Sequence, residues 1–253
     1  MGTPPPLWSP STDRILEKVI VWGGVALLVG LFLFMMLPAV QTDDGRPVRR
    51  TECKNHLKQL ALAMHNYHDA YGCFPPAYVA DKNGRRMHSW RVLLLRFLEE
   101  GGLYKQYRFD EPWDGPHNRA LAAQTPLIFR CASDLENTTE ANYFVVVGPN
   151  TVFPGATPIG IKDITDGTAN TILLVEAIHS GINWLEPQDM SYEEAVRGIN
   201  CKAGWSISSR HKGGAQVAFA DGSVRFLPND TPVEQLPRML ERNDGQEVTW
   251  PSQ

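Results

Sequence analysis

Residues 48–71 read VRRTECKNHLKQLALAMHNYHDAY, and this stretch decides the fold. Its apolar side chains recur at steps of three and four, so they form one stripe along a helix. Gly72 and the pair Pro75-Pro76 follow, which predicts that the helix ends near Tyr71. The residues of the stripe are Leu57, Leu60, Ala61, Met64, His68 and Tyr71.

An uncharged apolar run precedes this helix. Residues 19–40 read VIVWGGVALLVGLFLFMMLPAV and as a helix would be about 33 Å long, enough to cross a bilayer core of about 30 Å. A secretory signal peptide has a shorter apolar region and a small-residue cleavage site, which PAVQTDD matches poorly. We therefore expect a disordered lead at 1–18, a transmembrane anchor at 19–40 in the lipid bilayer, and a globular domain at 41–253.

Strand patterns replace the helical period beyond about residue 125. Asp221-Gly222 separates the last two candidates and predicts a tight hairpin with positive φ at both positions. Before this region, SWRVLLLRFLEEGG predicts a second helix with Ser89 as its N-cap and Gly101 as its end. The sequence thus predicts an α+β fold with an antiparallel sheet. The candidate strands are NYFVVVG (142–148), NTILLVEA (170–177), QVAFA (216–220) and SVRFL (223–227).

Composition and motifs exclude several classes of function. The chain has 24 Lys and Arg against 28 Asp and Glu, a net charge of −4, which gives no electrostatic reason to expect nucleic acid as a partner. The G-x-S-x-G, H-E-x-x-H, Walker and dinucleotide glycine patterns are all absent from the sequence. We therefore expect neither catalysis nor an organic cofactor.

Four cysteines are present: Cys53, Cys73, Cys131 and Cys201. None of their spacings is C-x-x-C, so the pattern does not favour a zinc or thioredoxin-type site. In an exported domain four cysteines permit two disulfides with three connectivities. The alternative is that some of them are buried free thiols.

Oxygen-bearing residues gather in KDITDGTANT, where Asp163, Asp166 and Asn170 supply ligands of the type that calcium prefers. The alternative is ordinary turn and cap chemistry. Glu176, in the strand that follows, either completes such a site, pairs with an arginine, or is a half-exposed strand residue.

Histidines give two further candidates. His65 and His68 are three residues apart on the predicted helix, where they either bind one metal ion or are packed or solvated. His211 precedes the first hairpin strand, whereas Asp221 and Gly222 lie in the turn. A strand length therefore separates His211 from Asp221, which favours structural roles over a catalytic pair.

Several phrases resemble a known family. In chain order they are MLPAVQ, CKNHLKQLALAMHNYHDAYGCFPPA, SWRVLLLRFLEEGGLYKQY, FDEPWDGPHNRAL, IFRCASD, VVVGPNTVFPG, IKDITDGTANTILLVE and SSRHKGGAQVAFADGSVRFL. They cover roughly residues 37–230 and resemble the bacterial domain-of-unknown-function family 1559. Its members carry a prepilin-like N-terminus and an H-X9-DG motif, matched here by His211, Asp221 and Gly222.

The resemblance implies a pilin-like fold on the outer side of the cytoplasmic membrane. It implies a structural or interaction role, with other pilin-like or secretion-system subunits as partners, and no known reaction. It also favours a disulfide that involves Cys53 or Cys131, because it passes through both. The alternative is a module that binds a solute or carbohydrate, with Trp184 and Trp205 as exposed aromatic residues.

The N-terminus departs from the family pattern. No Gly-Phe pair precedes the apolar run, and Val21 stands where pilins carry their assembly glutamate. We therefore expect an uncut anchor that does not enter a filament. A count of Lys and Arg on the two flanks would place the domain in the cytoplasm, whereas the resemblance places it outside. We adopt the orientation that the resemblance implies.

Overall fold

The computed structural model describes residues 18–25, 27–29, 46–134 and 139–249. The chain divides into two units, Met1–Asp44 and Gly45–Gln253. Most of the predicted anchor lies outside the described residues, and its described part is helical with exposed side chains. Within the described ranges, no helix combines the length and the apolar character that a membrane crossing requires.

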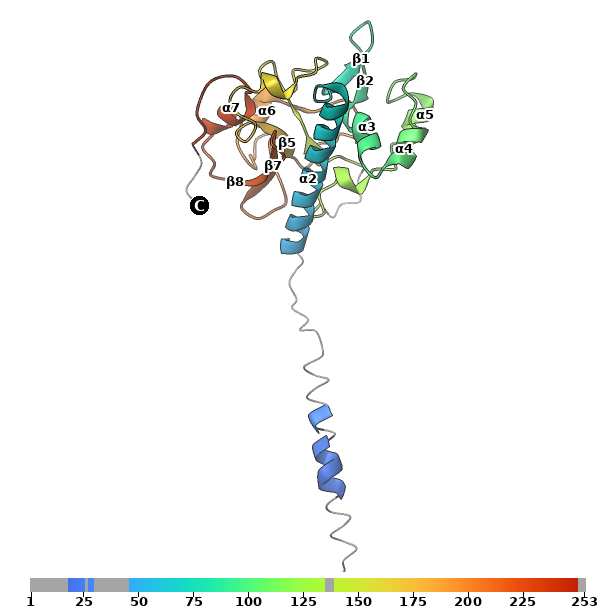
Figure 1. Cartoon of the computed structure of the whole chain (residues 1–253), viewed down its shortest axis with the longest axis vertical. Helices are drawn as coiled ribbons and strands as arrows, with labels where there is room; N and C mark the ends of the chain where they lie inside the picture. The colour runs from blue at the N-terminus through green and yellow to red at the C-terminus, as the bar shows by residue number, and fades with distance from the viewer. Residues whose placement is uncertain (1–17, 26, 30–45, 135–138, 250–253) are drawn as a thin grey trace, which may run out of the picture. The chain divides into compact units, whose positions relative to one another are not determined.

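Helix α2 (Arg46–Tyr71) is the central element of the second unit (Figure 1). Its predicted stripe is buried from Leu57 to Met64, whereas Tyr71 at the end of the stripe is half exposed. Gly72 follows with φ +76°, and its N–H donates to the carbonyl of His68 at 2.7 Å. A glycine in the left-handed region is a common helix end, so α2 ends where the sequence predicts.

An antiparallel sheet of four strands packs against α2, which confirms the α+β class. β5 and β7 are central and buried along their whole length, and α2 contacts β5, β7 and β8. A long helix therefore lies across a sheet whose strands all come later in the sequence (Figure 1). In spatial order the strands are β3 (Tyr143–Phe144), β5 (Ile172–Glu176), β7 (Gly214–Phe219) and β8 (Val224–Pro228).

The hairpin between β7 and β8 forms at the predicted place with a different turn. Gly222 has φ +83°, but Asp221 does not have a positive φ. The Gly222 N–H donates to the carbonyl of Phe219 at 2.9 Å, and the Phe219 N–H donates to that of Ser223 at 2.8 Å. This is a three-residue loop with glycine in the left-handed position, rather than the predicted two-residue turn.

Short elements flank the other side of α2. Ser89 caps α3 by accepting from the Arg91 N–H, as predicted, but the α-helix ends at Leu94. A 3-10 turn follows, and Leu98 is extended. Gly101, the expected end, instead begins a new helix. The elements are β1 (Tyr78–Ala80), β2 (Arg86–Ser89), α3 (Trp90–Leu94), η1 (Leu95–Phe97), α4 (Gly101–Gln106), α5 (Pro116–Arg119) and η2 (Leu127–Phe129).

The strand predicted at 142–148 is divided in two. Between its halves, the Val145 N–H donates to the Asp189 carboxylate at 3.2 Å instead of to a strand. The same carboxylate accepts from Arg91 at 2.9 Å in a fully buried ion pair, and from Trp90 Nε1 at 2.9 Å. The remaining elements are β4 (Val146–Val147), which pairs in parallel with β6 (Met190–Ser191), η3 (Ile161–Asp163), α6 (Tyr192–Ala195) and α7 (Gln235–Leu240).

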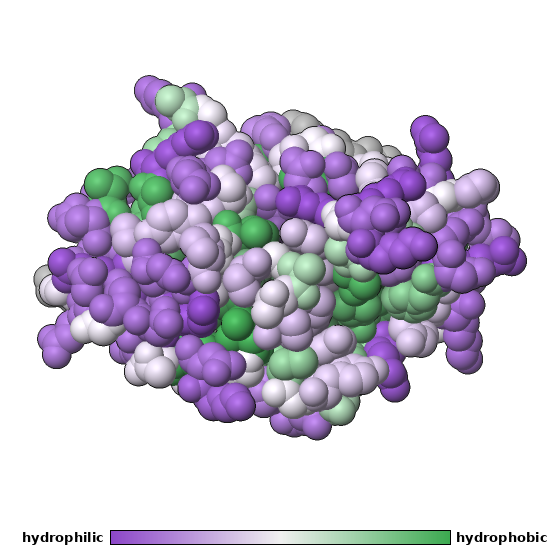
Figure 2. Space-filling view, turned by 90° about the horizontal axis from the view of Figure 1, so that it is seen from above, coloured by the Kyte–Doolittle hydropathy of each residue, from purple (hydrophilic) through white to green (hydrophobic). Residues whose placement is uncertain are grey.

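The face of the second unit seen in Figure 2 is mainly polar. Figure 2 shows a largely hydrophilic face on which apolar side chains emerge only in small, separate spots. Scattered apolar residues of this kind are normal on a soluble surface and do not mark an interface by themselves.

Candidate functional site

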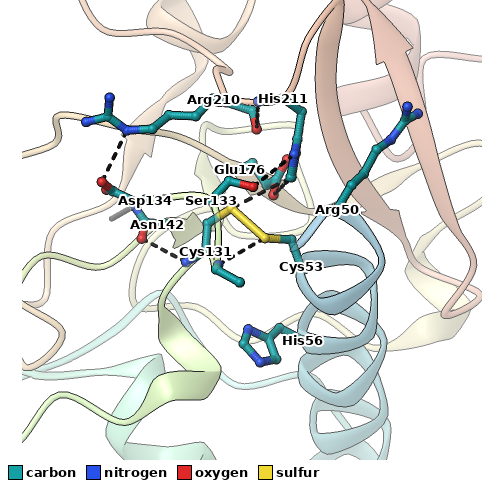
Figure 3. Close-up of a disulfide and its surroundings, with 12 residues drawn as sticks. Arg50, Cys53, His56, Cys131, Ser133, Asp134, Asn142, Glu176, Arg210 and His211 are labelled. Atoms are coloured by element: carbon teal, nitrogen blue, oxygen red, sulfur yellow. Dashed lines mark hydrogen bonds and ion pairs between the residues drawn. A yellow bond between two sulfur atoms is a disulfide. The ribbon is translucent and has the colours of Figure 1, made fainter. Parts of the chain in front are cut away.

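A disulfide and a buried histidine meet beside the N-terminal part of α2 (Figure 3). The disulfide joins Cys53 in α2 to Cys131, which follows η2, and their Cα atoms are 5.3 Å apart. Both cysteines are buried, and the Ala132 N–H donates to Cys53 Sγ at 3.1 Å. The crosslink fixes the segment after η2 against α2. Cys73 and Cys201 are free thiols.

His211 lies against this disulfide. Its Nε2 is 3.7 Å from Cys131 Sγ and 3.4 Å from Glu176 Oε1, and its Nδ1 is 3.3 Å from Ser133 Oγ. The His211 backbone N–H donates to Ser209 Oγ at 3.1 Å. Both ring nitrogens therefore face polar groups inside the protein, and the side chain is 3% exposed.

Glu176 is the residue that sequence reasoning placed wrongly. It ends β5, its side chain is almost completely buried, and its Oε2 accepts from the Gln216 N–H at 2.8 Å. The half-exposed position and the arginine partner that we considered are therefore incorrect, since its partner is His211. A buried carboxylate needs such partners because desolvation of a charge is costly. A strand pattern alone carries no signal for a histidine that is 35 positions further along the chain.

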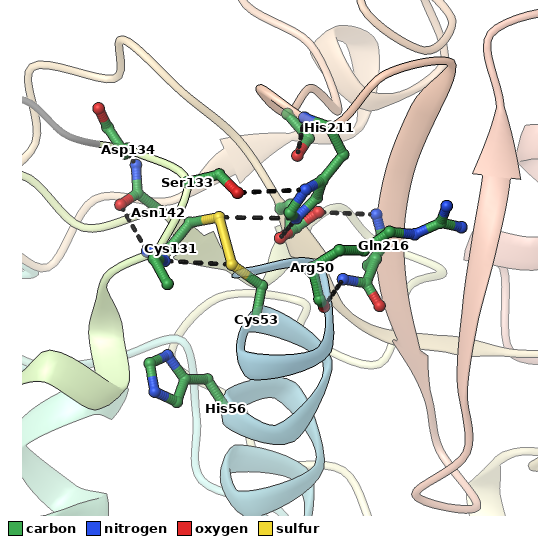
Figure 4. Close-up of polar contacts among 12 residues, drawn as sticks. Arg50, Cys53, His56, Cys131, Ser133, Asp134, Asn142, His211 and Gln216 are labelled. Atoms are coloured by element: carbon green, nitrogen blue, oxygen red, sulfur yellow. Dashed lines mark hydrogen bonds and ion pairs between the residues drawn. A yellow bond between two sulfur atoms is a disulfide. The ribbon is translucent and has the colours of Figure 1, made fainter. Parts of the chain in front are cut away.

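The two parts of the H-X9-DG motif lie at opposite ends of β7. Asp221 accepts from the Ser223 N–H at 2.8 Å within the hairpin loop, and Gly222 provides the positive φ of that loop. His211 lies before β7. Within β7, the backbone N–H of Gln216 donates to Glu176, and its side-chain amide donates to the Arg50 carbonyl in α2 at 2.8 Å (Figure 4). The motif thus marks a histidine at the disulfide and a turn at the far end of the strand.

A cavity of about 670 Å³ opens beside His211 and the start of α2. Val224 and Phe226 form its apolar wall, and the guanidinium of Arg50 lies 3.7 Å from the Phe226 ring centre. Arg210, which also lines the cavity, pairs with Asp134 at 3.2 Å. No acidic side chain lines the cavity among the residues that the structure describes. The basic side chains that line it are Arg49, Arg50, Lys54, Arg210, His211 and Lys212.

The family model described as "Protein of unknown function (DUF1559)" matches residues 45–152 and 186–234, more than half of the chain. The chain belongs to this family. The matched residues include both disulfide cysteines and the H-X9-DG motif, whereas Glu176 lies between the two matched segments. No curated protein and no solved structure matches the chain.

In this DUF1559 member the three residues considered for calcium each make hydrogen bonds to backbone groups. Asp163 accepts from the Gly160 N–H at 2.9 Å, and Asp166 accepts from the N–H groups of Asp244 and Gly245. Asn170 donates its side-chain amide to the Asp166 carbonyl at 3.2 Å. The contacts of Asp163 and Asn170 are the local turn and cap chemistry that was the alternative, whereas Asp166 holds a segment 78 residues further along the chain. Calcium binding here stays a prediction.

His65 and His68 share a packing partner. The Ile161 N–H donates to His68 Nε2 at 3.2 Å, and both imidazoles pack against the ring of Phe74. These contacts favour the packed reading of the two histidines.

The tryptophans considered for a carbohydrate surface do not form one. Trp184 is fully buried and stacks on Phe129, with ring centres 6.1 Å apart. Trp205 is partly buried and packs edge-on against Phe144. Trp184 is therefore a residue of the hydrophobic core, the position that tryptophan more often takes.

Proposed function

We propose that the chain is a membrane-anchored, pilin-like binding protein of the bacterial envelope, and that its globular domain holds an anionic ligand without catalysing a reaction. The observation that carries the proposal is the basic cavity beside His211. Basic residues converge there on a chain whose net charge is −4. When the side chains that line a concave site all carry the same sign of charge, they raise the local concentration of ligands of the opposite charge.

The lining of the cavity indicates the chemical class of the ligand. Arginine binds phosphate and carboxylate groups in bidentate geometry, and Arg49 and Arg50 both line the cavity. Phe226 and Val224 provide an apolar wall on the same cavity. We expect a small molecule or headgroup that combines a phosphate or carboxylate with an apolar part.

The pilin-like part of the proposal rests on the packing of α2. The helix has 26 residues, lies on an antiparallel sheet, and follows closely after the apolar run at 19–40. Pilin-like family members share this order of anchor, long helix and sheet. A role as a subunit of an envelope assembly is therefore the second candidate, and recovery of the chain in sheared filaments would favour it.

A hydrolase is the competing class, because Ser133, His211 and Glu176 lie in a row at 3.3 and 3.4 Å. Such a row resembles a nucleophile, a base and an orienting carboxylate. A serine hydrolase would turn over an activated ester and lose that turnover in Ser133→Ala. We expect no turnover that depends on Ser133.

Thermal stabilisation of the full chain in detergent tests the anion-binding proposal. Phosphate and citrate should raise the melting temperature, neutral sugars should not, and added salt should weaken the effect. Two cavity lysines, Lys54 and Lys212, are exposed, so the double variant Lys54→Glu/Lys212→Glu should fold and lose the stabilisation.

Lys82→Glu, in the loop between β1 and β2, is the matched control and should keep the full response. The proposal fails if no anion stabilises the wild-type chain, or if the double variant responds as the wild type does.

A further inference from the structure

Four buried side chains with metal-binding groups converge at the disulfide. Cys53, Cys131, Glu176 and His211 each direct one ligand atom to a common centre, and these atoms lie within 4.8 Å of one another. They come from α2, the segment after η2, the end of β5 and the segment before β7 (Figures 3 and 4). All four are buried, so this cluster is not a group of surface charges that happen to be close.

The four groups form a ligand set that zinc accepts. Two thiolates, an imidazole and a carboxylate are the donors of tetrahedral zinc sites, with bonds of about 2.0–2.3 Å. Neighbouring ligand atoms in such a tetrahedron are about 3.3–3.8 Å apart. The separations of His211 Nε2 from Cys131 Sγ, 3.7 Å, and from Glu176 Oε1, 3.4 Å, already lie in that range.

An unsatisfied atom points to the same centre. Glu176 Oε1 is buried and accepts no hydrogen bond, although His211 Nε2 lies 3.4 Å from it, while Oε2 of the same carboxylate is held by the Gln216 N–H. Glu176 is therefore oriented with one oxygen toward the sulfur atoms and the imidazole. Buried acceptors without a donor are uncommon and call for an explanation, of which an ion is one.

Outer contacts hold the other ligands in position. If His211 donates from Nδ1 to Ser133 Oγ, the lone pair of Nε2 faces the cluster, which is the tautomer that metal ligation requires. The Ala132 N–H donates to Cys53 Sγ, a contact that also suits a thiolate. Outer-shell contacts of this kind are a regular feature of metal sites.

We propose that reduction of the Cys53–Cys131 disulfide converts this cluster into a zinc site formed by Cys53, Cys131, Glu176 and His211. A dithiol reductant supplies two electrons and two protons, so the S–S bond becomes two thiols and the reductant becomes a disulfide. Zinc then displaces both thiol protons and binds the two thiolates. The oxidised and the metal-bound states thus crosslink the same elements in two different ways.

The surroundings suit the charge of the complex. Two thiolates and one carboxylate around Zn²⁺ leave a formal charge of one negative unit, and the basic side chains of the adjacent cavity offset it. This inference concerns the disulfide cluster and is independent of whether the cavity binds an anion.

Cobalt titration of the reduced full chain in detergent tests the proposal, with a phosphine as reductant. We expect one Co²⁺ per chain, a near-ultraviolet thiolate-to-cobalt band, visible bands of a tetrahedral site, and displacement by one Zn²⁺. The oxidised chain should show none of these bands. Zn²⁺ should also raise the melting temperature of the reduced chain and not that of the oxidised chain.

Variants separate the cluster from the other thiols. Cys53→Ser and His211→Gln should weaken cobalt binding by more than about tenfold, since loss of even an outer-shell partner costs roughly 10–100-fold. Glu176→Gln should do the same while it keeps an acceptor for the Gln216 N–H. The double variant Cys73→Ser/Cys201→Ser removes only the two free thiols and should bind as the wild type does.

Three results would overturn the proposal. The first is a reduced, folded chain without the thiolate band. The second is a reduced chain that is unfolded and does not refold with Zn²⁺. The third is equal binding by Cys53→Ser and the wild type, which would place the metal elsewhere.

Discussion

Gly222 has a backbone conformation that few other residues tolerate. Its φ is +83°, and a Cβ added there would meet no atom within 4 Å, so a substitution is opposed by backbone strain and not by a clash. Gly222→Val should lower the free energy of unfolding by about 1–3 kcal/mol. Gly222→Asn is the matched control and should lose much less, because asparagine enters the left-handed region more readily. If Gly222→Val and the wild type unfold at the same urea concentration, the turn assignment is refuted.

His88 makes the stability of the domain depend on pH. Its imidazole is 5% exposed, with Nδ1 2.8 Å from the Tyr107 hydroxyl. Burial lowers the pKa of His88 from 6.5, and a backbone hydrogen bond to Phe109 only partly opposes this. The unfolded chain therefore binds a proton that the folded chain excludes, so the contribution is complete above about pH 6.5 and is lost as the pH falls through the folded pKa.

His88→Gln should accordingly lose less stability than the wild type between pH 7 and pH 5. The exposed His117→Gln is the control and should keep the wild-type dependence. Chemical denaturation at both pH values measures the difference. A steeper loss in His88→Gln than in the wild type would contradict the sign.

Sequence patterns predict residues that act through the local backbone, and fail for residues that act across the fold. Gly222 and Ser89 were assigned correctly because turns and caps depend on immediate neighbours. Glu176 was not, because its partner His211 is set by the pairing of β5 with β7. The two ends of the H-X9-DG motif can be recognised in the sequence. The cluster that His211 forms with Glu176 and the disulfide cannot.

At the scale of elements, α2 was predicted best because its apolar period extends over several turns. The strand expected at 142–148 shows the opposite case. Its residues have strong strand propensity, yet Val145 bonds to the carboxylate of the buried pair formed by Arg91 and Asp189. Tertiary contacts thus overrode a local preference, as commonly happens for short strands.

The packing of α2 gives a paired prediction within one helix. Leu60 is fully buried, whereas Leu62 is 60% exposed. Leu60→Ala should lower the free energy of unfolding by about 2–5 kcal/mol, because it removes core contacts and leaves a cavity. Leu62→Ala makes the same chemical change and should stay within about 0.5 kcal/mol of the wild type. Equal losses in urea melts would contradict the assigned face of α2.

At the scale of the whole molecule, the contacts and the family match describe the same part of the chain. The sequence predicts a domain from residue 41, and contacts define a compact unit Gly45–Gln253, within which the whole family match falls. The basic cavity was not predicted, because its residues come from α2 and from segments around residues 133, 210 and 224. Only the fold brings those segments together.

The central claim is that this domain lies outside the cytoplasm on an uncut anchor. Protease accessibility in spheroplasts that express the full chain tests it most directly, with a cytoplasmic protein as the control. Added protease should remove residues 45–253 and leave a short protected fragment that begins at Met1, while the cytoplasmic control stays intact. A domain that resists the protease until detergent opens the membrane would contradict the claim.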